Sequence, residues 1–470
     1  MRKAVLAAAI LALLPLQGRA QDTDRSRAAI AAGYKAAFLC SDIFTAGLPE
    51  SEVERDDLTR IYPDYQDLLP GLKATIDRQH RIVSVPFAPD MAPRIAAWRP
   101  HLGCAQLPVG AGMEAVAALP GLRTPLPFAD QDARSWPQGD AGARVAPLSA
   151  VADRLDQVVA SAFDHRTFGQ DTETTGVVVV KDGRIVAERY REGFDLHTPQ
   201  RTWSAAKSIT GTLVGIAVGK GLLDVNAPAN IPEWRRPGDP RAKITLADLM
   251  HMSSGLYSGR AGNRTDQLYF GGQAVTETST ANPLEAPPGR RWRYANNDTL
   301  LIMRSLHAAI GDDQAYLAFP FRELFLPIGM TRTTPETDWR GDYVLSSQVW
   351  TTARDLARLG MLYLNDGVWQ GRRILPEGWT RFVATPALSQ PDAGAGGKGP
   401  GYGAQFWLFG PKQGLPAGTY AALGNRGQYV LIVPSERLVV VRRGFDGGRP
   451  GDKQFDEAAF TAAVIAALRP

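Results

Sequence analysis

The spacing of hydrophobic residues predicts an antiparallel sheet built from both ends of one large domain. Strand-like apolar runs lie at 175–180, 185–190, 404–409, 429–433 and 438–442. The first two runs are joined by Lys181-Asp182-Gly183, and an Asp-Gly pair between such runs is a strong hairpin signal. Helical spacing is found at 148–163 and at 457–468. We therefore expect an α+β fold in which a large helical insertion separates the strands.

An apolar segment lies inside this insertion and follows a candidate nucleophile. Residues 209–223 carry Lys220 as their only charge, which is typical of a buried core helix. If the helix begins near Ser204, then Ser204 and Lys207 lie one turn apart on the same face. A serine hydroxyl needs a base to become a nucleophile, and a lysine with a lowered pKa can be that base. Taken alone the pattern is weak, and a surface serine beside a solvated lysine is the alternative.

The first twenty residues have the three-part layout of a secretory signal. Arg2 and Lys3 precede an apolar run at 4–14, and Gly18-Arg19-Ala20 precedes Gln21. We predict a signal peptide over residues 1–20, cut near Ala20-Gln21, and a periplasmic or secreted protein. The apolar run is too short to span a bilayer, so no stable membrane anchor is expected.

The charge balance gives no electrostatic reason for binding nucleic acid. The formal net charge is +4, and the predicted signal peptide carries Arg2, Lys3 and Arg19 with no acidic residue. Removing these three positive charges from +4 leaves +1 for the mature chain. A nearly neutral protein does not attract a polyanion, so we expect no nucleic-acid partner.

The two cysteines, Cys40 and Cys104, both lie in the N-terminal quarter. An even count in an exported protein predicts one structural disulfide, and two separate buried thiols are the alternative. The chain has no Cys-x-x-Cys, and its six histidines include no pair with metal-ligand spacing. We expect neither a metal nor a cofactor.

The length of the chain predicts two parts, because about 450 mature residues exceed one ordinary core. Residues 120–147 are rich in proline, glycine and charge, and we interpret them as a linker or as a strap lying on the next domain. Residues 21–119 then form a small accessory domain without evident chemistry. Residues 148–470 form the catalytic domain.

Two further motifs fall inside this second domain. Tyr294 and Asn296 are two apart, so both can face a cleft; the charge of Lys207 would lower the pKa of the phenol, and the amide would hold a substrate carbonyl or the lysine. A packed tyrosine is the alternative. Residues 424–430 bring glycines to the start of a strand, where a backbone N–H can join that of Ser204 in binding an oxyanion. An ordinary turn is the alternative there.

Together these residues resemble the serine β-lactamase and penicillin-binding-protein superfamily, over roughly residues 150 to 465. Ser204-Ala-Ala-Lys207 is similar to its first motif and Tyr294-Ala-Asn296 to its second. The resemblance is to class C-like serine hydrolases, which include esterases and 6-aminohexanoate-dimer hydrolases, and it is extended by the phrases at 244–256, 326–330 and 347–358. The chain has no Gly-x-Ser-x-Gly, which argues against an α/β-hydrolase.

The third motif departs from the lactamase pattern. Where lactamases have Lys-Thr-Gly or His-Thr-Gly, this chain has Leu423-Gly-Asn-Arg-Gly-Gln428. The resemblance implies that the missing lysine would hold the carboxylate of a β-lactam or a D-Ala terminus, and Arg426 replaces it only if it faces the cleft. The residues that the resemblance and the loop position assign to the oxyanion or the substrate are Asn425, Asn296, Gly427, Gln428 and Tyr257, with Tyr269 as a further residue that lines the cleft.

The resemblance implies a serine hydrolase that cleaves a small ester or amide through an acyl-enzyme on Ser204, and the predicted signal peptide implies that it is exported. Lys207 and Tyr294 would share the proton transfers. A β-lactamase or D-Ala-D-Ala carboxypeptidase is the alternative, and a weakly active penicillin-binding or sensing module is a second one. The sequence does not indicate an oligomeric state.

Overall fold

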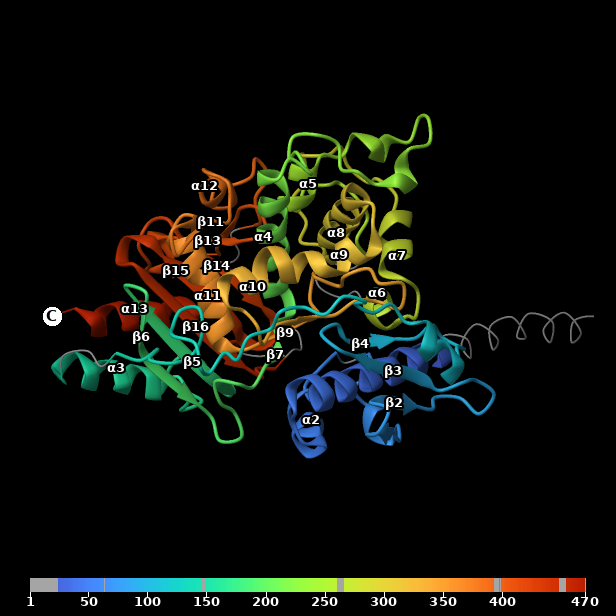
Figure 1. Ribbon diagram of the computed structural model, residues 1–470, viewed down its shortest axis with the longest axis horizontal. Coiled ribbons are helices and arrows are strands. Elements are labelled where there is room, and N and C mark those ends of the chain that lie inside the picture. The colour runs from blue at the N-terminus through green and yellow to red at the C-terminus, as the bar shows by residue number, and fades with distance from the viewer. Residues whose placement is uncertain are drawn as a thin grey trace, which may run out of the picture.

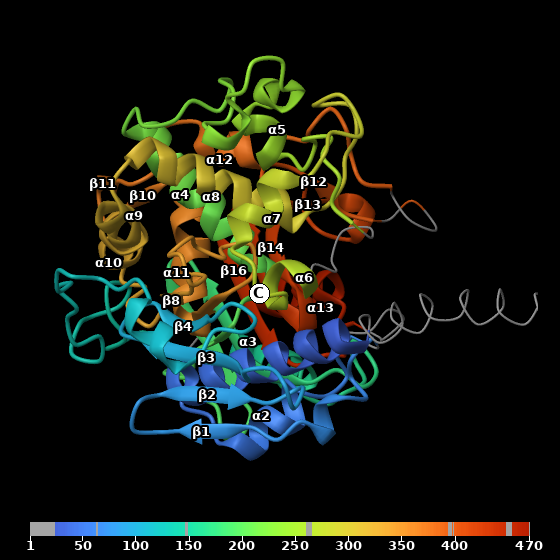
Figure 2. The same cartoon turned by 90° about the vertical axis from the view of Figure 1, so that its right-hand side faces the viewer.

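The computed structural model describes residues 24–62, 64–145, 149–259, 266–392, 397, 399–447 and 454–469. These residues form an N-terminal unit, a central sheet with helices on both faces, and a helical region above it (Figures 1 and 2). The predicted signal peptide lies outside the described residues.

The central sheet has seven strands in the order β12-β13-β14-β15-β16-β5-β6, with every neighbouring pair antiparallel. Its strands are β5 (Thr174–Lys181), β6 (Arg184–Tyr190), β12 (Gly401–Tyr402), β13 (Trp407–Phe409), β14 (Thr419–Gly424), β15 (Gln428–Val433) and β16 (Leu438–Gly444). The predicted hairpin is confirmed as β5 and β6, and β16 from the end of the chain pairs with β5. The α+β class is confirmed.

Two details of the sheet differ from the prediction. The run at 404–409 is a strand only at its end, because Gln405 has φ 63° and turns the chain before β13. Strand β14 was not expected at all. The first four of its six residues, beginning with Thr419, are all buried. The strand therefore shows no alternation of polar and apolar positions.

Each face of the sheet is covered by helices (Figure 1). On one face, α3 (Ser149–Ser161) and α13 (Glu457–Leu468) enclose a core that contains Leu155, Val179, Leu431 and Val464. On the other face, α11 (Ala353–Leu364) packs on β5, β15 and β16, and α4 (Ala206–Gly219) packs against β14. The chain thus encloses α4, the predicted core helix, within the largest hydrophobic cluster of the molecule.

The helical region is the insertion that the sequence predicted. Its helices are α5 (Leu246–Met250), α6 (Asp266–Phe270), α7 (Val275–Ala281), α8 (Asn296–Ile310), α9 (Asp313–Pro320), α10 (Leu326–Ile328) and α12 (Trp379–Val383). Short strands connect it to the sheet: β7 (Gln200–Arg201), β9 (Val349–Thr351) and β8 (Thr334–Pro335) in one small sheet, and β10 (Val368–Trp369) with β11 (Arg372–Arg373). Single turns complete the chain: η2 (Leu69–Gly71), η3 (Met113–Ala118), η5 (Pro232–Trp234), η6 (Pro240–Lys243), η7 (Phe321–Phe325), η8 (Pro411–Gln413) and η10 (Pro434–Glu436).

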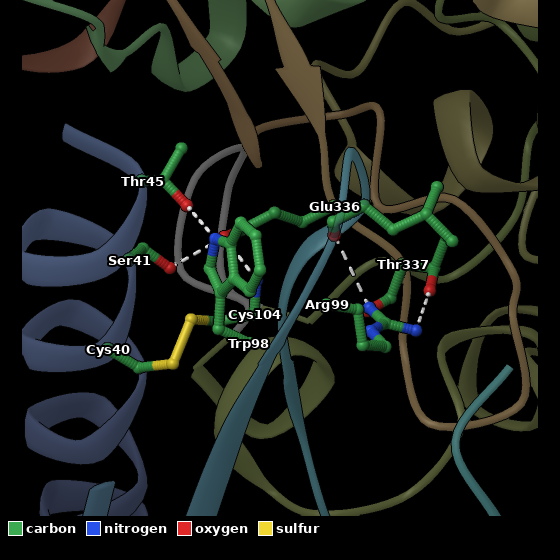
Figure 3. The surroundings of a disulfide bond; sticks show 9 residues. Cys40, Ser41, Thr45, Trp98, Arg99, Cys104, Glu336 and Thr337 are labelled. Carbon is green, nitrogen blue, oxygen red and sulfur yellow. Dashed lines mark hydrogen bonds between the residues drawn. A yellow bond between two sulfur atoms is a disulfide. The ribbon is translucent and has the colours of Figure 1, made fainter. Parts of the chain in front are cut away.

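The N-terminal unit, residues 24–119, has its own sheet and core. A helix over 24–41 runs into the π-turn η1 (Asp42–Ala46) and is followed by α2 (Glu50–Asp56). The sheet has the order β1-β2-β3-β4, with strands β1 (Thr75–Asp77), β2 (Ile82–Val85), β3 (Arg94–Arg99) and β4 (Gly103–Gln106). The predicted disulfide is present: Cys40 at the end of the helix is bonded to Cys104 in β4, with the Cα atoms 6.2 Å apart (Figure 3).

Residues 120–145, the described part of the predicted linker, lie as a strap along the second domain. Trp136 is buried in the main core, and the Arg358 guanidinium of α11 lies 4.8 Å from the centre of its ring. Arg358 also donates to the carbonyls of Pro137 and Gly139 at 2.7 and 2.6 Å. The strap is therefore held by buried polar contacts, in contrast to a flexible tether.

None of the helices in the described part of the chain is long and apolar enough to cross a membrane.

Candidate active site

Ser204 and Lys207 lie where the sequence predicted, at the start of the core helix. Ser204 is in the single 3-10 turn η4 (Trp203–Ala205), and Lys207 is in the first turn of α4. The lysine amine Nζ is 3.2 Å from Ser204 Oγ. Ser204 is partly exposed, whereas Lys207 is buried. The helix that supports them is buried on all sides, so the pair has a rigid base.

The second motif meets this pair from the opposite side. Lys207 Nζ donates a hydrogen bond to Asn296 Oδ1 in the first turn of α8 and another, of 2.8 Å, to the carbonyl of Ser346. The Tyr294 ring centre is 4.9 Å from the same amine, and its hydroxyl shares a hydrogen bond with Ser204. Four side chains from two distant stretches of sequence therefore surround one point.

A neighbouring loop holds the second motif in position. The N–H of Arg293 donates to the carbonyl of Met252 at 2.8 Å, and Ser254 Oγ donates to Asp298 Oδ1 at 2.8 Å. Burial raises the pKa of Asp298 to about 7, and the hydrogen bond from Ser254 opposes that rise. The loop folds tightly at Gly255, where φ is 78° and a Cβ would lie 2.0 Å from the carbonyl oxygen of Ala286. Gly255 lies in the phrase at 244–256 that extends the family resemblance.

Burial shifts the pKa values of the two proton-transfer candidates in opposite directions. It lowers the pKa of Lys207 well below its ordinary value of 10.5, because the charged form is desolvated. It raises the pKa of Tyr294, and the hydrogen bond with Ser204 opposes this only in part. The expectation of a lowered phenol pKa is therefore wrong: desolvation raises the pKa of Tyr294, so the tyrosine stays protonated. The same burial lowers the pKa of Lys207 and so favours its neutral form.

The end of strand β14 lies directly against the turn that carries Ser204. A Cβ on Gly424 would lie 2.1 Å from the carbonyl oxygen of Thr202 and 3.1 Å from the N–H nitrogen of Ala205. The sequence then turns through η9 (Asn425–Gly427) into β15. Asn425 is partly exposed at this point, next to the nucleophile turn. The backbone of Gly424 therefore packs closely against the nucleophile turn.

Three other residues of the third motif point away from the nucleophile. Arg426 is buried and donates to the carbonyls of Asp56 and Thr59 in the N-terminal unit, so it does not provide the carboxylate grip considered from the sequence. The reason is its positive φ of 58°, which breaks the alternation of a strand. Gln428 is buried with its amide bonded to Gly444 and Arg443. Gly427 is enclosed by the Arg442 guanidinium.

The tyrosines of the loop between the first two motifs differ in their positions. Tyr257 is exposed, and its carbonyl accepts a hydrogen bond from Asn297 Nδ2. The Tyr269 hydroxyl lies 2.7 Å from Ser346 Oγ. Ser346 in turn accepts a hydrogen bond from Lys207 through its carbonyl, so Tyr269 is linked to Lys207 by one intervening residue. The sequence did not single out Ser346, because its contact with Lys207 is made by a backbone carbonyl, which leaves no signal in the residue type.

An aromatic wall extends from Tyr294 along one side of the site. The ring centre of Tyr294 is 5.4 Å from that of Trp407 in β13 and 5.9 Å from that of Tyr402 in β12. Trp292 closes the group at 5.7 Å from Tyr402, and Met252 packs among these rings. Sequence reasoning missed this wall, because its members come from three segments that only the fold brings together.

Comparisons with known proteins identify a matching family and similar folds. The family model described as Beta-lactamase matches residues 156–450. The 6-aminohexanoate-dimer hydrolase of Paenarthrobacter ureafaciens is 24% identical over 318 residues, which cover 62% of this chain and 77% of that protein. Among solved structures, a family VIII carboxylesterase aligns with a TM-score of 0.53 and 16% identity over 68% of this chain and 96% of its own. A penicillin-binding protein homologue from Caulobacter crescentus aligns with a TM-score of 0.54 and 14% identity over 69% and 97%.

Proposed function

The chain belongs to the beta-lactamase family, and we propose that it is an exported serine hydrolase that cleaves esters or linear amides through an acyl-enzyme on Ser204. The relatives named as hydrolases support the reaction class. The choice of ester or linear amide, the export and the role of each residue are the content of the proposal.

The observation that carries the proposal is the set of partners around Lys207. A neutral amine has two N–H donors and one lone pair. The carbonyl oxygens of Asn296 and Ser346 accept the two N–H groups. The lone pair is then left for Ser204 Oγ, 3.2 Å away. Burial favours the neutral amine, so the lowered pKa and the orientation of Lys207 both suit a general base.

The reaction then follows from the positions of the remaining groups. Lys207 takes the proton of Ser204, and Oγ attacks the substrate carbonyl. The N–H groups of Ser204 and Asn425 bind the oxyanion, in keeping with the close approach of Gly424 to the nucleophile turn. Tyr294, protonated and bonded to Ser204, passes a proton to the leaving alcohol or amine and regains one from Lys207. Water attacks the acyl-enzyme with the same two residues as acid and base.

The charged residues around the third motif support a substrate that has no carboxylate to be bound there. Among the described residues of this motif and of strand β16, Arg426 bonds to the N-terminal unit and Arg442 to Asp446. Arg443 bonds to Gln428 and to the carbonyl of Thr351. Trp292 and Trp407, the partly exposed members of the aromatic wall, add an apolar surface for an acyl chain or an alcohol. These features disfavour β-lactams and D-Ala peptides.

The disulfide supports export, because disulfides persist in oxidising compartments. It agrees with a signal peptide over residues 1–20 and a periplasmic or secreted location. The partner of the mature protein is then a small-molecule ester or amide.

The test is a rate assay of the mature protein on three substrates: a short nitrophenyl ester, a linear aminohexanoate dimer and a chromogenic cephalosporin. We expect turnover of the ester or the linear amide to dominate. The Ser204→Ala variant is expected to lose all turnover and all labelling by a fluorophosphonate, because no other group of the site can form the acyl-enzyme.

Each other outcome rejects a defined part of the proposal. Cephalosporin turnover above that of the ester and the amide would favour a β-lactamase and reject the substrate class. A single burst followed by a stable adduct would favour a penicillin-binding or sensing module. Labelling that persists in Ser204→Ala would remove Ser204 from the mechanism.

A further inference from the structure

Two residues beside the proposed oxyanion hole have an unfavourable backbone conformation. Trp203 immediately precedes Ser204 and has φ 48°, and Arg426 immediately follows Asn425 and has φ 58°. Left-handed conformations are disfavoured for residues that carry a Cβ, and they persist only where the surrounding structure enforces them. The two N–H groups proposed to bind the oxyanion thus each have a strained neighbour.

The N-terminal unit holds the side chain of Trp203 in place. It is buried in the hydrophobic core of that unit, with its ring centre 5.8 Å from that of Phe38 in helix 24–41. The guanidinium of Arg201 lies 4.2 Å from the Trp203 ring centre and 4.7 Å from that of Phe38. Trp203 therefore belongs to the nucleophile turn by its backbone and to the N-terminal core by its side chain.

The same unit also holds the side chain of Arg426 in place. Its Nη1 donates to the carbonyl of Thr59 at 3.2 Å and its Nη2 to the carbonyl of Asp56, at the end of α2. Nη2 also reaches the carbonyl of Phe445 at 3.4 Å. Arg426 is buried, so water does not replace these carbonyls in the folded protein.

The N-terminal unit is itself fixed to the second domain. Glu336 reaches between the two disulfide-bonded segments and accepts hydrogen bonds from Ser41 Oγ at 2.6 Å and from the N–H of Cys104 at 3.0 Å (Figure 3). Beside it, Arg99 Nη1 donates to Thr337 Oγ1 at 2.9 Å. The unit that anchors both strained residues is therefore held rigidly against the loops it contacts.

We propose that the N-terminal unit, which lies outside the family match, positions both N–H donors of the oxyanion hole by anchoring Trp203 and Arg426. Arg426 is a positioning residue, since it acts through the backbone of Asn425. This inference rests on the proposed function and gives residues 24–119 a role in the reaction.

The experiment compares an oxygen ester with the matched thionoester, in which sulfur replaces the carbonyl oxygen. Sulfur is a poor hydrogen-bond acceptor, so an intact oxyanion hole accelerates the oxygen ester far more than the thionoester. A variant that only lowers the folded fraction reduces both rates equally and leaves their ratio unchanged. The ratio of kcat/KM on the two substrates therefore reports the oxyanion hole itself.

Arg426→Ala is expected to lower kcat/KM on the oxygen ester about 100-fold, the size of effect seen when one oxyanion donor is lost. The thionoester rate should fall much less, so the ratio should fall at least about tenfold. Phe38→Leu, which loosens the packing of Trp203, should lower the ratio in the same direction and serves as the second variant if Arg426→Ala does not fold.

Arg437→Ala is the matched control. Arg437 also has a positive φ, 46°, but its side chain is exposed, and among the described residues that side chain forms a hydrogen bond only with Asp182. Its ratio should equal that of the wild type. Suppose that the wild-type protein shows Ser204-dependent turnover but that Arg426→Ala and Phe38→Leu both leave the ratio of kcat/KM values unchanged. That result would overturn this inference and leave the proposed function standing. Wild-type protein without Ser204-dependent ester turnover would overturn the proposed function instead.

Discussion

Asp140 in the strap is the residue whose loss should destabilise the protein most clearly. Its carboxylate is almost fully buried, with a side-chain exposure of 3%, and three guanidinium groups contact it. Arg358 Nη2 is 2.7 Å and Arg354 Nη1 3.4 Å from Oδ1, and Arg332 bonds to Oδ2. Asp140→Asn keeps the shape of the side chain and removes the negative charge that these three cations share.

The expected cost follows from which partners remain. Breaking a buried ion pair by removing one member typically costs about 3–5 kcal/mol, because the other charge is left buried without compensation. Here Arg354 keeps Glu188 at 2.7 Å and Arg358 keeps Asp355 at 2.9 Å. We therefore expect the lower end of that range, about 3 kcal/mol of unfolding free energy, or roughly 6 °C in Tm at about 2 °C per kcal/mol for a large domain.

The assay is urea and thermal unfolding of Asp140→Asn beside the control Asp132→Asn. Asp132 lies in the same strap and also pairs with Arg332, but its side chain is 54% exposed. Its loss should cost less than about 1 kcal/mol and should be weakened further by salt. A cost for Asp140→Asn equal to that of the control, or one that salt abolishes, would show that the strap is not held by buried charge.

Three further predictions concern the site. Burial lowers the pKa of Lys207 well below 10.5, so kcat/KM on an ester should rise with pH through that lowered pKa and level off well below pH 10.5. A rise in kcat/KM that is centred near pH 10.5 would contradict the role of Lys207 as a neutral general base. The unfolded chain binds the additional proton between the lowered pKa and 10.5, so the unfolding free energy should also rise with pH in that window, with a slope that is smaller in Lys207→Met. Gly424→Ala places a Cβ 2.1 Å from the carbonyl oxygen of Thr202 and should lower kcat at least about tenfold, while Gly410→Ala, whose Cβ meets nothing within 4 Å, should leave kcat unchanged in the same ester assay.

The features that the sequence predicts correctly are those with a local cause. The Asp182-Gly183 turn determines the β5–β6 hairpin, and the apolar composition after Ser204 determines a core helix. Even so, only the fold determines the pKa shifts, since the burial that lowers the pKa of Lys207 and raises that of Tyr294 comes from residues distant in sequence.

The direction of Arg426 depends on a single backbone torsion angle, so residue type and strand alternation do not predict it. The aromatic wall likewise joins Trp292, Tyr402 and Trp407 from three segments. Resemblance identified the motifs of the family, but it carries no information on residues 24–119, which lie outside the family match at 156–450.

The pairing of β5 with β16 also determines the order in which the protein matures. Val178 is opposite Val441, so the central sheet closes only when the last strands of the chain have been synthesised. The N-terminal unit, in contrast, has both of its cysteines and all four strands by Gln106. The whole sequence of this unit is therefore synthesised well before β16, and Trp203 of the nucleophile turn is added to its core only afterwards. A chain cut short before β16 would carry every proposed catalytic residue but lack the strand that pairs with β5, and we expect it to be inactive.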